Sequence, residues 1–381
     1  MLISTPDLGH AELAVLAQIA SLRDGRLRQY TEHRPHRWSG SLRRLTFARN
    51  IQGSNSIEGF AATLDDAAAV ALGEPPLDAT TETQRALAGY RDAMTYVLQL
   101  SSDPDFRYSD QLLKSLHFMM TSYHLRNHPG RWRPGPVYVQ REHDGEIVHE
   151  GAPADAVPGL MQELVDALNN SVGEDPIVVA AMAHLNLVMV HPYKDGNGRM
   201  ARALQSLVLA RGGTLSPVFV SVEEYLGRNT QTYYEVLAEV GGGIWNPDRD
   251  ATPWLRFMLT AHLRQATTLL QRIDESDQVW TALERLRTSL GFPERAMTAV
   301  FDATMGWRIR NATYRAALAE QGDELSEHLA TTDLKRLVDA GLLVPVGEKR
   351  GRHYVASGQL LRVRAEARAA QRPRLPDPFL S

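Results

Sequence analysis

The stretch HPYKDGNGRMARAL, residues 191–204, places a histidine, a carboxylate, two glycines and two arginines close together. Gly196 and Gly198 permit a tight turn that leaves the backbone amides unobstructed. Helical spacing resumes after this turn, so its amides lie at a helix N-terminus, where free N–H groups and the helix dipole favour an anion. Arg199 and Arg202 are spaced i and i+3 and therefore share one face of the first turn. Together these features predict a binding site for a polyphosphate.

Two further side chains of this stretch could take part in chemistry. His191 can take up a proton near neutral pH, and Asp195 offers the carboxylate oxygens that Mg²⁺ prefers. Other phosphate and metal motifs do not fit. No Lys-Ser/Thr pair follows the glycines as in a P-loop, the preceding segment is helical rather than the strand of a dinucleotide-binding turn, and an EF-hand would need an acceptor where Arg199 stands. We therefore interpret the stretch as a nucleotide phosphate site.

The elements that position this site are predicted to be mostly helices. Apolar residues recur at three- and four-residue spacing in the segments 10–30, 41–58, 62–73, 81–100, 108–122, 155–170 and 177–190. One region departs from this pattern. VYVQREHDGEIVHEG, residues 137–151, predicts two short strands around Asp144-Gly145, a pair of residues typical of a hairpin turn. A lone hairpin is marginally stable, so it must lean on the helices.

A different pattern begins beyond about residue 273. Helical segments at 275–290, 294–303, 311–321 and 331–343 precede two short strands in VPVGEKRGRHYVA. Helix, turn, helix and then a hairpin is the order of elements in a winged-helix domain. Residues 331–381 hold ten Lys/Arg and five Asp/Glu, an excess that suits a phosphate-facing surface. Contact with DNA and contact with protein alone both remain open for this domain.

The composition limits the other functions. The 381 residues are 43% hydrophobic and 23% charged with a net charge of −4, as in a globular protein without a bulk attraction to nucleic acid or membrane. The absence of cysteine excludes disulfides, thiolate nucleophiles and Cys-rich zinc sites. The start MLISTPDLGHAELA does not read as a signal peptide. The apolar run 177–190 is shorter than the ~20 residues of a membrane helix. We expect a cytoplasmic protein without membrane contact.

The catalytic stretch resembles the signature of a known family. HPYKDGNGRMAR is similar to the Fic motif His-x-Phe-x-Asp/Glu-Gly-Asn-Gly-Arg-x-x-Arg, with Tyr193 where Phe is usual. The resemblance implies an all-α, Fic-fold helical core with a small β-hairpin flap, plus a C-terminal winged-helix domain. The expected divisions are an N-terminal helical region with an inhibitory helix, a Fic core, the winged helix and a tail, at 1–100, 101–272, 273–370 and 371–381.

An enzymatic activity also follows from the resemblance. Fic enzymes typically transfer AMP from ATP to a Tyr, Ser or Thr hydroxyl of a protein and release pyrophosphate. His191 would then deprotonate the hydroxyl, and Asp195 would hold Mg²⁺ across the α- and β-phosphates. Asn197 would join His191 as a catalytic residue by stabilising anionic oxygens. The nucleotide phosphates would be bound by Gly196, Asn197, Gly198, Arg199 at the β-phosphate and Arg202 at the γ-phosphate.

Two further regions gain roles from the same resemblance. The hairpin would be the flap, whose main chain at Val137, Tyr138 and Val139 docks the target segment by strand pairing; Ile147–His149 offers a second edge. The segment LGRNTQTYYEVL, residues 226–237, resembles the part that closes over adenine. Asn229, Tyr233 and Tyr234 are the candidates there, although either tyrosine fits a core position equally well.

A second short motif, SNSIEG at residues 54–59, could control the site. By itself it reads as a helix C-terminus capped by Gly59. It also resembles the inhibitory motif Ser/Thr-x-x-x-Glu-Gly/Asn of many Fic proteins, in which Ser54 and Glu58 would be one helical turn apart. A Glu58 carboxylate paired with Arg202 would occupy the place of the γ-phosphate. The same glutamate could instead position water to remove AMP from a modified protein.

We therefore expect an autoinhibited protein adenylyltransferase with Mg²⁺ as cofactor and ATP as substrate. Its expected partners are ATP, a hydroxyl-bearing protein target and a second copy of the chain in a homodimer, with DNA through the winged helix also considered. Two alternatives remain open. One is a de-AMPylase that uses the same site, and the other is a DNA-binding regulator whose Fic core senses nucleotide.

Overall fold

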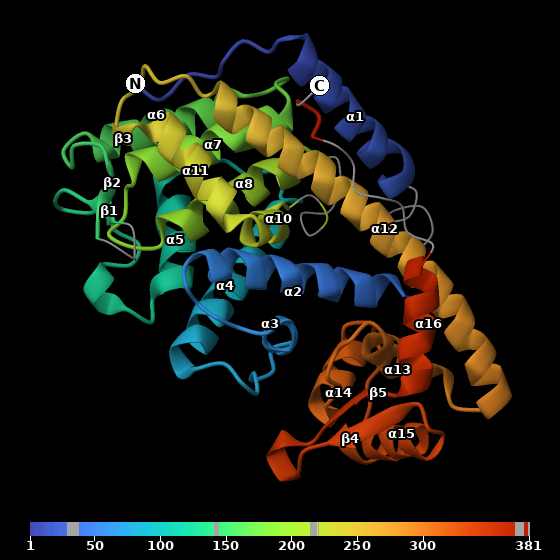
Figure 1. Ribbon diagram of the computed structural model, residues 1–381. Helices are drawn as coiled ribbons and strands as arrows, with labels where there is room; N and C mark the ends of the chain where they lie inside the picture. The colour runs from blue at the N-terminus through green and yellow to red at the C-terminus, as the bar shows by residue number, and fades with distance from the viewer. Residues whose placement is uncertain (29–37, 141–144, 214–218, 220, 370–376, 380–381) are drawn as a thin grey trace.

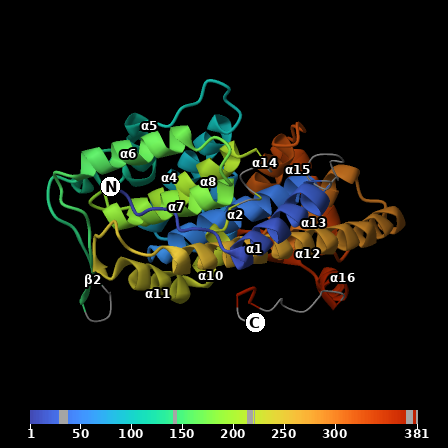
Figure 2. The same cartoon turned by 90° about the horizontal axis from the view of Figure 1, so that it is seen from above.

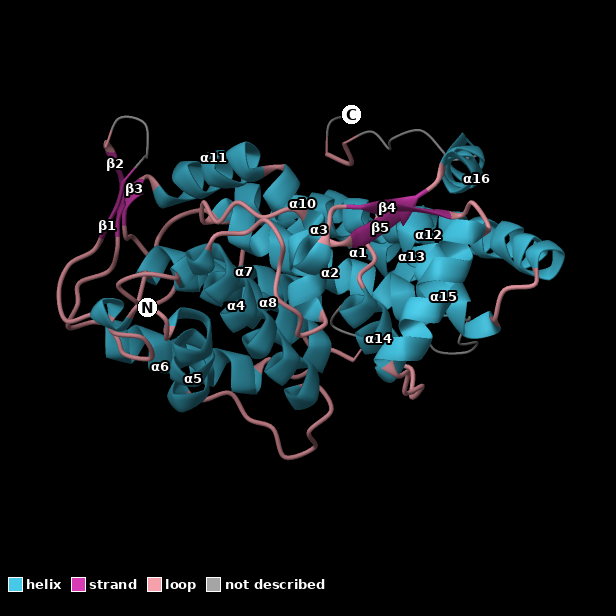
Figure 3. Ribbon diagram, turned by 90° about the horizontal axis from the view of Figure 1, so that it is seen from below, coloured by secondary structure: helices cyan, strands magenta, loops and turns pink. Residues whose placement is uncertain are grey.

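The computed structural model describes residues 1–28, 38–140, 145–213, 219, 221–369 and 377–379. Helices form most of this part of the chain, and the strands form two small, separate sheets (Figure 3). Asp144 of the predicted hairpin turn lies outside the described residues, as does most of the predicted tail 371–381. No helix in the described ranges is long and apolar enough to cross a membrane.

The N-terminal third consists of helices and one π-helical turn, which are α1 (His10–Ala20), η1 (Ser21–Leu27), α2 (Ser39–Ile57), α3 (Leu64–Ala71), α4 (Thr81–Leu100) and α5 (Asp110–Thr121). Local sequence explains several helix starts. Thr63, Thr80 and Ser109 precede α3, α4 and α5, and each side chain accepts a hydrogen bond from the third following amide. These caps satisfy N–H groups that a helix cannot pair internally.

The centre of the molecule is built around two adjacent helices. It contains η3 (Leu125–Asn127), α6 (Val157–Asn170), α7 (Pro176–Val190), α8 (Asn197–Arg211), α10 (Glu223–Arg228), α11 (Thr230–Gly241) and α12 (Thr252–Leu290). Helix α7 is apolar on all sides and almost wholly buried. Asp175 caps it by accepting the Ile177 N–H (2.8 Å). His184 in its middle contacts the side chains of Gln205 and Tyr233, so this buried imidazole is paired.

A three-stranded sheet lies beside this core, where the sequence predicted a hairpin alone. β1 (Tyr138–Gln140) runs antiparallel to β2 (Ile147–Glu150), and β3 (Gly243–Ile244) pairs in parallel with the other edge of β2. β3 has only two residues, too few to leave a periodic signal in the sequence. Because β2 is the central strand, the edge that β1 presents away from β2 is unpaired within this sheet.

The C-terminal part contains η4 (Glu294–Ala296), α13 (Met297–Thr304), α14 (Asn311–Ala319), α15 (Glu327–Asp339), β4 (Leu343–Val346), η5 (Lys349–Gly351), β5 (His353–Ala356) and α16 (Gly358–Ala369). Helices followed by the antiparallel pair β4–β5 come in the order that the sequence predicted. The expected domain boundary after residue 272 falls inside α12, which runs through both parts of the molecule (Figure 1). No Gly or Pro interrupts residues 254–290, so nothing in the sequence ends this helix earlier.

Helix α2 connects the core to the C-terminal part, and it lies among the other helices in both views (Figures 1 and 2). Near its start, Arg44 pairs with Asp302 of α13 (3.0 Å). Near its end, Gly53 touches α10 so closely that a methyl group there would lie 2.5 Å from the Glu223 carbonyl oxygen. The two ends of α2 are therefore held by different parts of the protein.

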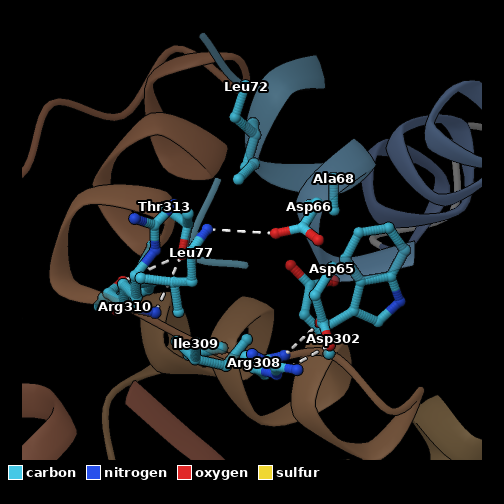
Figure 4. A pocket seen from close by; sticks show the side chains of 14 residues that line it. Asp65, Asp66, Ala68, Leu72, Leu77, Asp302, Arg308, Ile309, Arg310 and Thr313 are labelled. Carbon is cyan, nitrogen blue, oxygen red and sulfur yellow. Dashed lines mark hydrogen bonds and ion pairs between the residues drawn. The ribbon is translucent and has the colours of Figure 1, made fainter. Parts of the chain in front are cut away.

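A pocket lies at the contact between α3 and the C-terminal helices (Figure 4). Asp65 and Asp66 line it from α3, and Arg308 and Arg310 line it from the opposite side. Arg308 pairs with Asp65 (3.2 Å) and also with Asp78 (2.6 Å). These ion pairs join the two parts of the chain, and none of the residues of the predicted catalytic stretch lines this pocket.

Candidate active site

His191 stands where α7 ends. It adopts the left-handed conformation (φ 53°) and donates its N–H to the Leu187 carbonyl (3.0 Å), which closes the helix. The ring nitrogen Nδ1 lies 3.2 Å from the Val188 carbonyl, an acceptor only, so Nδ1 carries the proton and Nε2 is the basic nitrogen. Burial lowers the pKa of His191 to about 4. The imidazole is therefore neutral at physiological pH and able to accept a proton.

The turn after His191 has the geometry expected of an anion site. Gly196 is left-handed (φ 78°), and α8 begins at the next residue. Asn197 uses both ends of its amide to hold the turn, because Oδ1 accepts the Tyr193 N–H and Nδ2 donates to the Tyr193 carbonyl, each at 2.9 Å. In this conformation Asn197 shapes the loop, and its predicted contact with anionic oxygens stays a prediction.

Tyr193 fills a buried pocket beneath the turn. Its ring stacks on His117 with centroids 3.7 Å apart and planes 3° from parallel. The Tyr193 hydroxyl is buried without a hydrogen-bond partner among the described residues. His117 in turn contacts the Asp195 carbonyl through Nε2 (2.8 Å) and accepts the Gly130 N–H through Nδ1 (2.8 Å). His117 was not predicted as a site residue, because a single histidine in an amphipathic helix has no distinguishing pattern.

Asp195 has a donor set that fits Mg²⁺. Its Oδ1 accepts the Gly196 N–H (2.7 Å) and its Oδ2 accepts Nδ2 of Asn127 (2.9 Å), which leaves further lone pairs on both oxygens. No group of three or more His, Asp or Glu residues that could hold a metal occurs in the described ranges. A single carboxylate is nevertheless sufficient for Mg²⁺, which commonly takes its remaining ligands from phosphates and water.

Arg202 is held by the end of α2. Its Nε donates to the Ser54 hydroxyl (2.8 Å), and Nη2 donates to the Ser54 carbonyl (3.0 Å) and to Oε1 of Glu58 (2.6 Å). The Arg202 side chain is 1% exposed, whereas that of Glu58 is 20% exposed. A methyl group on Gly198 would collide with the Glu58 carboxylate. Glu58 therefore lies directly against the first turn of α8.

Arg199 is covered by residues that the sequence did not single out. Its Nη1 donates to the Tyr123 hydroxyl (2.8 Å), and its guanidinium lies 5.1 Å from the centre of the Phe60 ring. Phe60 follows Glu58 by two positions, so the short segment 58–60 covers Arg199 and Arg202 together. A single phenylalanine after a helix end carries no distinguishing pattern, so the sequence alone did not single out Phe60.

The hairpin approaches His191 at its base. A methyl group on Gly151 would lie 2.9 Å from Val137 and 3.1 Å from the Cβ of His191. The Val137 carbonyl accepts the Gly151 N–H (3.2 Å), and Val139 pairs with His149. Successive residues of an antiparallel strand alternate in the direction of their hydrogen bonds. The N–H and carbonyl of Tyr138 consequently face the free edge.

The three candidates for adenine contact differ in exposure. Tyr233 is 1% exposed, and its hydroxyl lies 2.9 Å from His184, so it occupies the core position that the sequence left open. Tyr234 is 46% exposed and donates its hydroxyl proton to the Ile57 carbonyl (2.9 Å) at the end of α2. Asn229 donates to the Tyr225 carbonyl (2.7 Å). Of the two tyrosines, Tyr234 presents a surface next to the 58–60 segment.

Comparison with known proteins relates this site to one family. Residues 107–209 match the family model described as Fic/DOC family. The protein adenylyltransferase fic-1 of Caenorhabditis elegans is 41% identical over 96 residues, 25% of this chain and 17% of that protein. The protein adenylyltransferase Fic of Nematostella vectensis is 27% identical over 233 residues, 56% of this chain and 46% of that protein. The chain thus spans less than half the length of these curated relatives.

Solved structures share the architecture. A Fic family protein from Desulfovibrio desulfuricans G20 superposes with a TM-score of 0.58 at 23% identity, over 93% of this chain and 98% of that chain. Fic-1 from C. elegans superposes with a TM-score of 0.54 at 25% identity, over 69% of this chain and 72% of that chain. The predicted helical core with a small hairpin is confirmed by these likenesses.

Proposed function

We propose that this chain, which contains a domain of the Fic/DOC family, transfers AMP from ATP to a hydroxyl side chain of a target protein, and that Glu58 holds the reaction off. The observation that carries the proposal is the position of the Glu58 carboxylate, 2.6 Å from Arg202 and against Gly198. A carboxylate in that place competes with a terminal phosphate for the same guanidinium.

In the proposed reaction, Nε2 of His191 removes the proton from the target hydroxyl. The hydroxyl oxygen then bonds to the α-phosphorus of ATP, the bond between that phosphorus and the oxygen bridging to the β-phosphate breaks, and pyrophosphate leaves. The first amides of α8 and the guanidinium groups of Arg199 and Arg202 stabilise the negative charge on the phosphates. Asp195 would hold Mg²⁺, which when bound neutralises charge between the α- and β-phosphates.

The free edge of β1 is the proposed docking site for the target. An extended segment paired with Tyr138 would place a side chain near His191, since Gly151 brings the hairpin against that residue. The second predicted edge, at Ile147–His149, is less suitable because β3 already pairs with β2 there. We therefore assign docking to β1 rather than to β2.

One alternative, removal of AMP from a modified protein, uses the same residues. The experiment described below separates transfer of AMP from its removal.

The DNA-binding alternative has weaker support. Lys349 and Arg352 lie on the β4–β5 turn, but Asp323, Glu324 and Glu327 precede or begin α15 and are exposed. Negative charge at the start of a helix that would enter a DNA groove repels phosphate.

The test of the proposed function is label transfer from α-phosphate-labelled ATP with Mg²⁺. The wild type, Glu58→Gly, and Glu58→Gly combined with His191→Ala would be incubated with cell lysate. We expect labelled proteins with Glu58→Gly, little label with the wild type, and none with the double variant. Absence of label from all three forms, together with release of AMP by the wild type from proteins that a different adenylyltransferase has labelled, would favour the reverse reaction instead.

A further inference from the structure

Arg133 is a buried cation whose guanidinium contacts only carbonyl oxygens among the described residues. It is 4% exposed and lies in the loop between η3 and β1. Nε donates to the His191 carbonyl (2.7 Å), and Nη1 donates to the Gly135 carbonyl (2.6 Å). Nη2 donates to the carbonyls of Ala152 and Val190. Because a buried charge is costly without hydrogen bonds, these bonds stabilise the cation at this position.

These bonds connect three segments whose relative positions matter for the proposed reaction. The first is the end of α7 with His191, and the other two are the legs of the hairpin, represented by Gly135 and Ala152. Backbone bonds follow the same route, since the Arg133 N–H donates to the Pro192 carbonyl (2.9 Å) and the Ala152 N–H donates to the Val190 carbonyl (3.2 Å). The Arg133 side chain thus lies where His191, the proposed catalytic base, meets the hairpin.

The bond to His191 also explains the unusual backbone at that residue. A non-glycine residue with positive φ is uncommon and needs support from its surroundings. Arg133 provides this support because its side chain donates a hydrogen bond to the His191 carbonyl, while the His191 N–H donates to the Leu187 carbonyl. All the Arg133 donors with a described partner point to backbone carbonyls, so the residue is not arranged to contact a phosphate directly.

We propose that Arg133 is a positioning residue, which holds His191 in its left-handed conformation and fixes the distance from this base to a target docked on β1. This inference rests on the proposed function, because the distance from His191 to a docked target matters only if His191 acts on that target. The charge of Arg133 has a second effect, because three charged or titratable groups influence His191: Arg133, His149 and Glu58. Burial is the main cause of the lowered pKa of His191, and the charge of Arg133 lowers it further.

Arg211 provides a matched control. Its Nη1 donates to the carbonyls of Leu100, Ser101 and Asp103 at 3.4, 3.1 and 2.7 Å, away from His191. Arg133→Met, Arg133→Lys and Arg211→Met would each be made in the full chain with Glu58→Gly. The measurements are kcat, KM for ATP, the pH dependence of kcat/KM, and the titration of the His191 ring by NMR.

We expect Arg133→Met to lower kcat about 100-fold, because misplacement of a catalytic group by ~1 Å has an effect of that order. KM for ATP should stay within about twofold, since Arg133 does not face the phosphates, and the pKa of His191 should rise. Arg133→Lys should restore the His191 titration and part of kcat, and Arg211→Met should change neither. Equal losses of kcat and ATP affinity without a change in the His191 titration would overturn the proposal.

The titration keeps this inference separate from the proposed function. If Glu58→Gly transfers no AMP, the proposed function fails, but the His191 titration and the hydrogen exchange of the Gly151 and Ala152 amides can still be compared between Arg133→Met and Arg211→Met. A raised His191 pKa with faster exchange in Arg133→Met alone would support the positioning role. Identical titration and exchange in the two variants would refute it.

Discussion

The carboxylate of Glu58 and the guanidinium of Arg202 meet at 2.6 Å across 144 residues of sequence. The Arg202 side chain is buried, whereas that of Glu58 is partly open to solvent. An incoming anion therefore reaches the Arg202 guanidinium by displacing the Glu58 carboxylate. Ser54 holds two other donor positions of the same guanidinium. Arg202 therefore keeps its orientation when Glu58 leaves, ready for another anion.

Glu58→Gln should strengthen ATP binding while leaving ADP binding nearly unchanged. The substitution keeps the size of the side chain but removes the charge that competes with the γ-phosphate. Hydrogen bonds to charged groups contribute about 1.5–3 kcal/mol, which corresponds to a gain of roughly 10-fold or more in ATP affinity. Calorimetric titration with both nucleotides measures this. Glu12→Gln is the matched control, because Glu12 pairs with Arg256 (2.6 Å) elsewhere.

Phe60→Ala should raise the affinity for ATP and ADP alike, and leave AMP binding unchanged. The Phe60 ring covers Arg199, the residue assigned to the β-phosphate, which ADP and ATP share. A cation–π contact at a partly exposed site contributes ~0.5–1 kcal/mol, so a gain of about threefold is expected. Phe106→Ala removes a similar contact with Arg211 (4.9 Å) and serves as the control. A gain confined to ATP would contradict the assignment of Arg199.

Tyr138→Pro should reduce labelling of the target without weakening ATP binding. Proline removes the N–H that faces the free edge of β1 but leaves the bonds of Val137 and Val139 to β2 in place. Tyr138→Ala keeps that N–H and separates loss of the side chain from loss of the main-chain donor. Labelling rates and ATP affinities would be measured for both variants. Equal labelling by the proline and alanine variants would argue against docking by strand pairing.

Tyr193→Phe should stabilise the protein slightly. The Tyr193 hydroxyl is buried without a partner in the described part of the chain, and an unsatisfied buried polar group costs about 1–3 kcal/mol. Stacking on His117 does not involve the hydroxyl and should persist. A rise of roughly 2 °C or more in the melting temperature is expected. Tyr314→Phe, which removes a hydroxyl bonded to Asp333 (3.2 Å), should lower it.

Stability should fall in acid partly through Glu224. Burial opposes ionisation of this carboxyl, but hydrogen bonds from Arg272 (2.6 Å each) and the charges of Arg272, Arg228 and Arg49 outweigh it and lower the pKa of Glu224 to about 2. A carboxyl with a depressed pKa in the folded state stabilises the fold above its unfolded pKa of about 4.5, and that contribution is lost as pH falls from there towards 2.

Glu224→Gln should therefore be less stable than the wild type at pH 7, with a difference that narrows as the pH falls from about 4.5 towards 2. Denaturant unfolding at a series of pH values measures this difference. Glu284→Gln, on the same long helix as Arg272, is the control. A difference between wild type and Glu224→Gln that stays constant across this pH range would show that the carboxylate contributes nothing through its charge.

Much of the fold was predictable because it depends on local signals. The end of α7 follows from Pro192 and the start of α8 from the glycine turn, whereas the segment 54–59 was selected by its resemblance to the Fic inhibitory motif. Helices with strong apolar periodicity, such as α4 and α6, were placed within a few residues. These features require no knowledge of distant contacts.

The features that were not predicted depend on contacts between segments that are far apart in the sequence. β3 forms only because β2 offers an edge, and the length of α12 reflects packing against both parts of the molecule. His117, Phe60 and Arg133 belong to common local patterns and gain importance only through the residues they meet in space. Their partners lie far along the chain, as in the contact of Arg133 with His191.

The close crossing of α2 and α10 limits how Glu58 can move away from Arg202. A methyl group on Gly227 would lie 2.7 Å from the Cα of Gly53, so the two backbones are in contact and α2 can neither slide nor rotate past this point. The Glu58 carboxylate would then leave Arg202 by fraying of the residues that follow Ser54, which itself stays bonded to Arg202. Fraying of one terminal turn requires far less free energy than global unfolding, and it would break the hydrogen bond that Tyr234 donates to the Ile57 carbonyl at the end of α2.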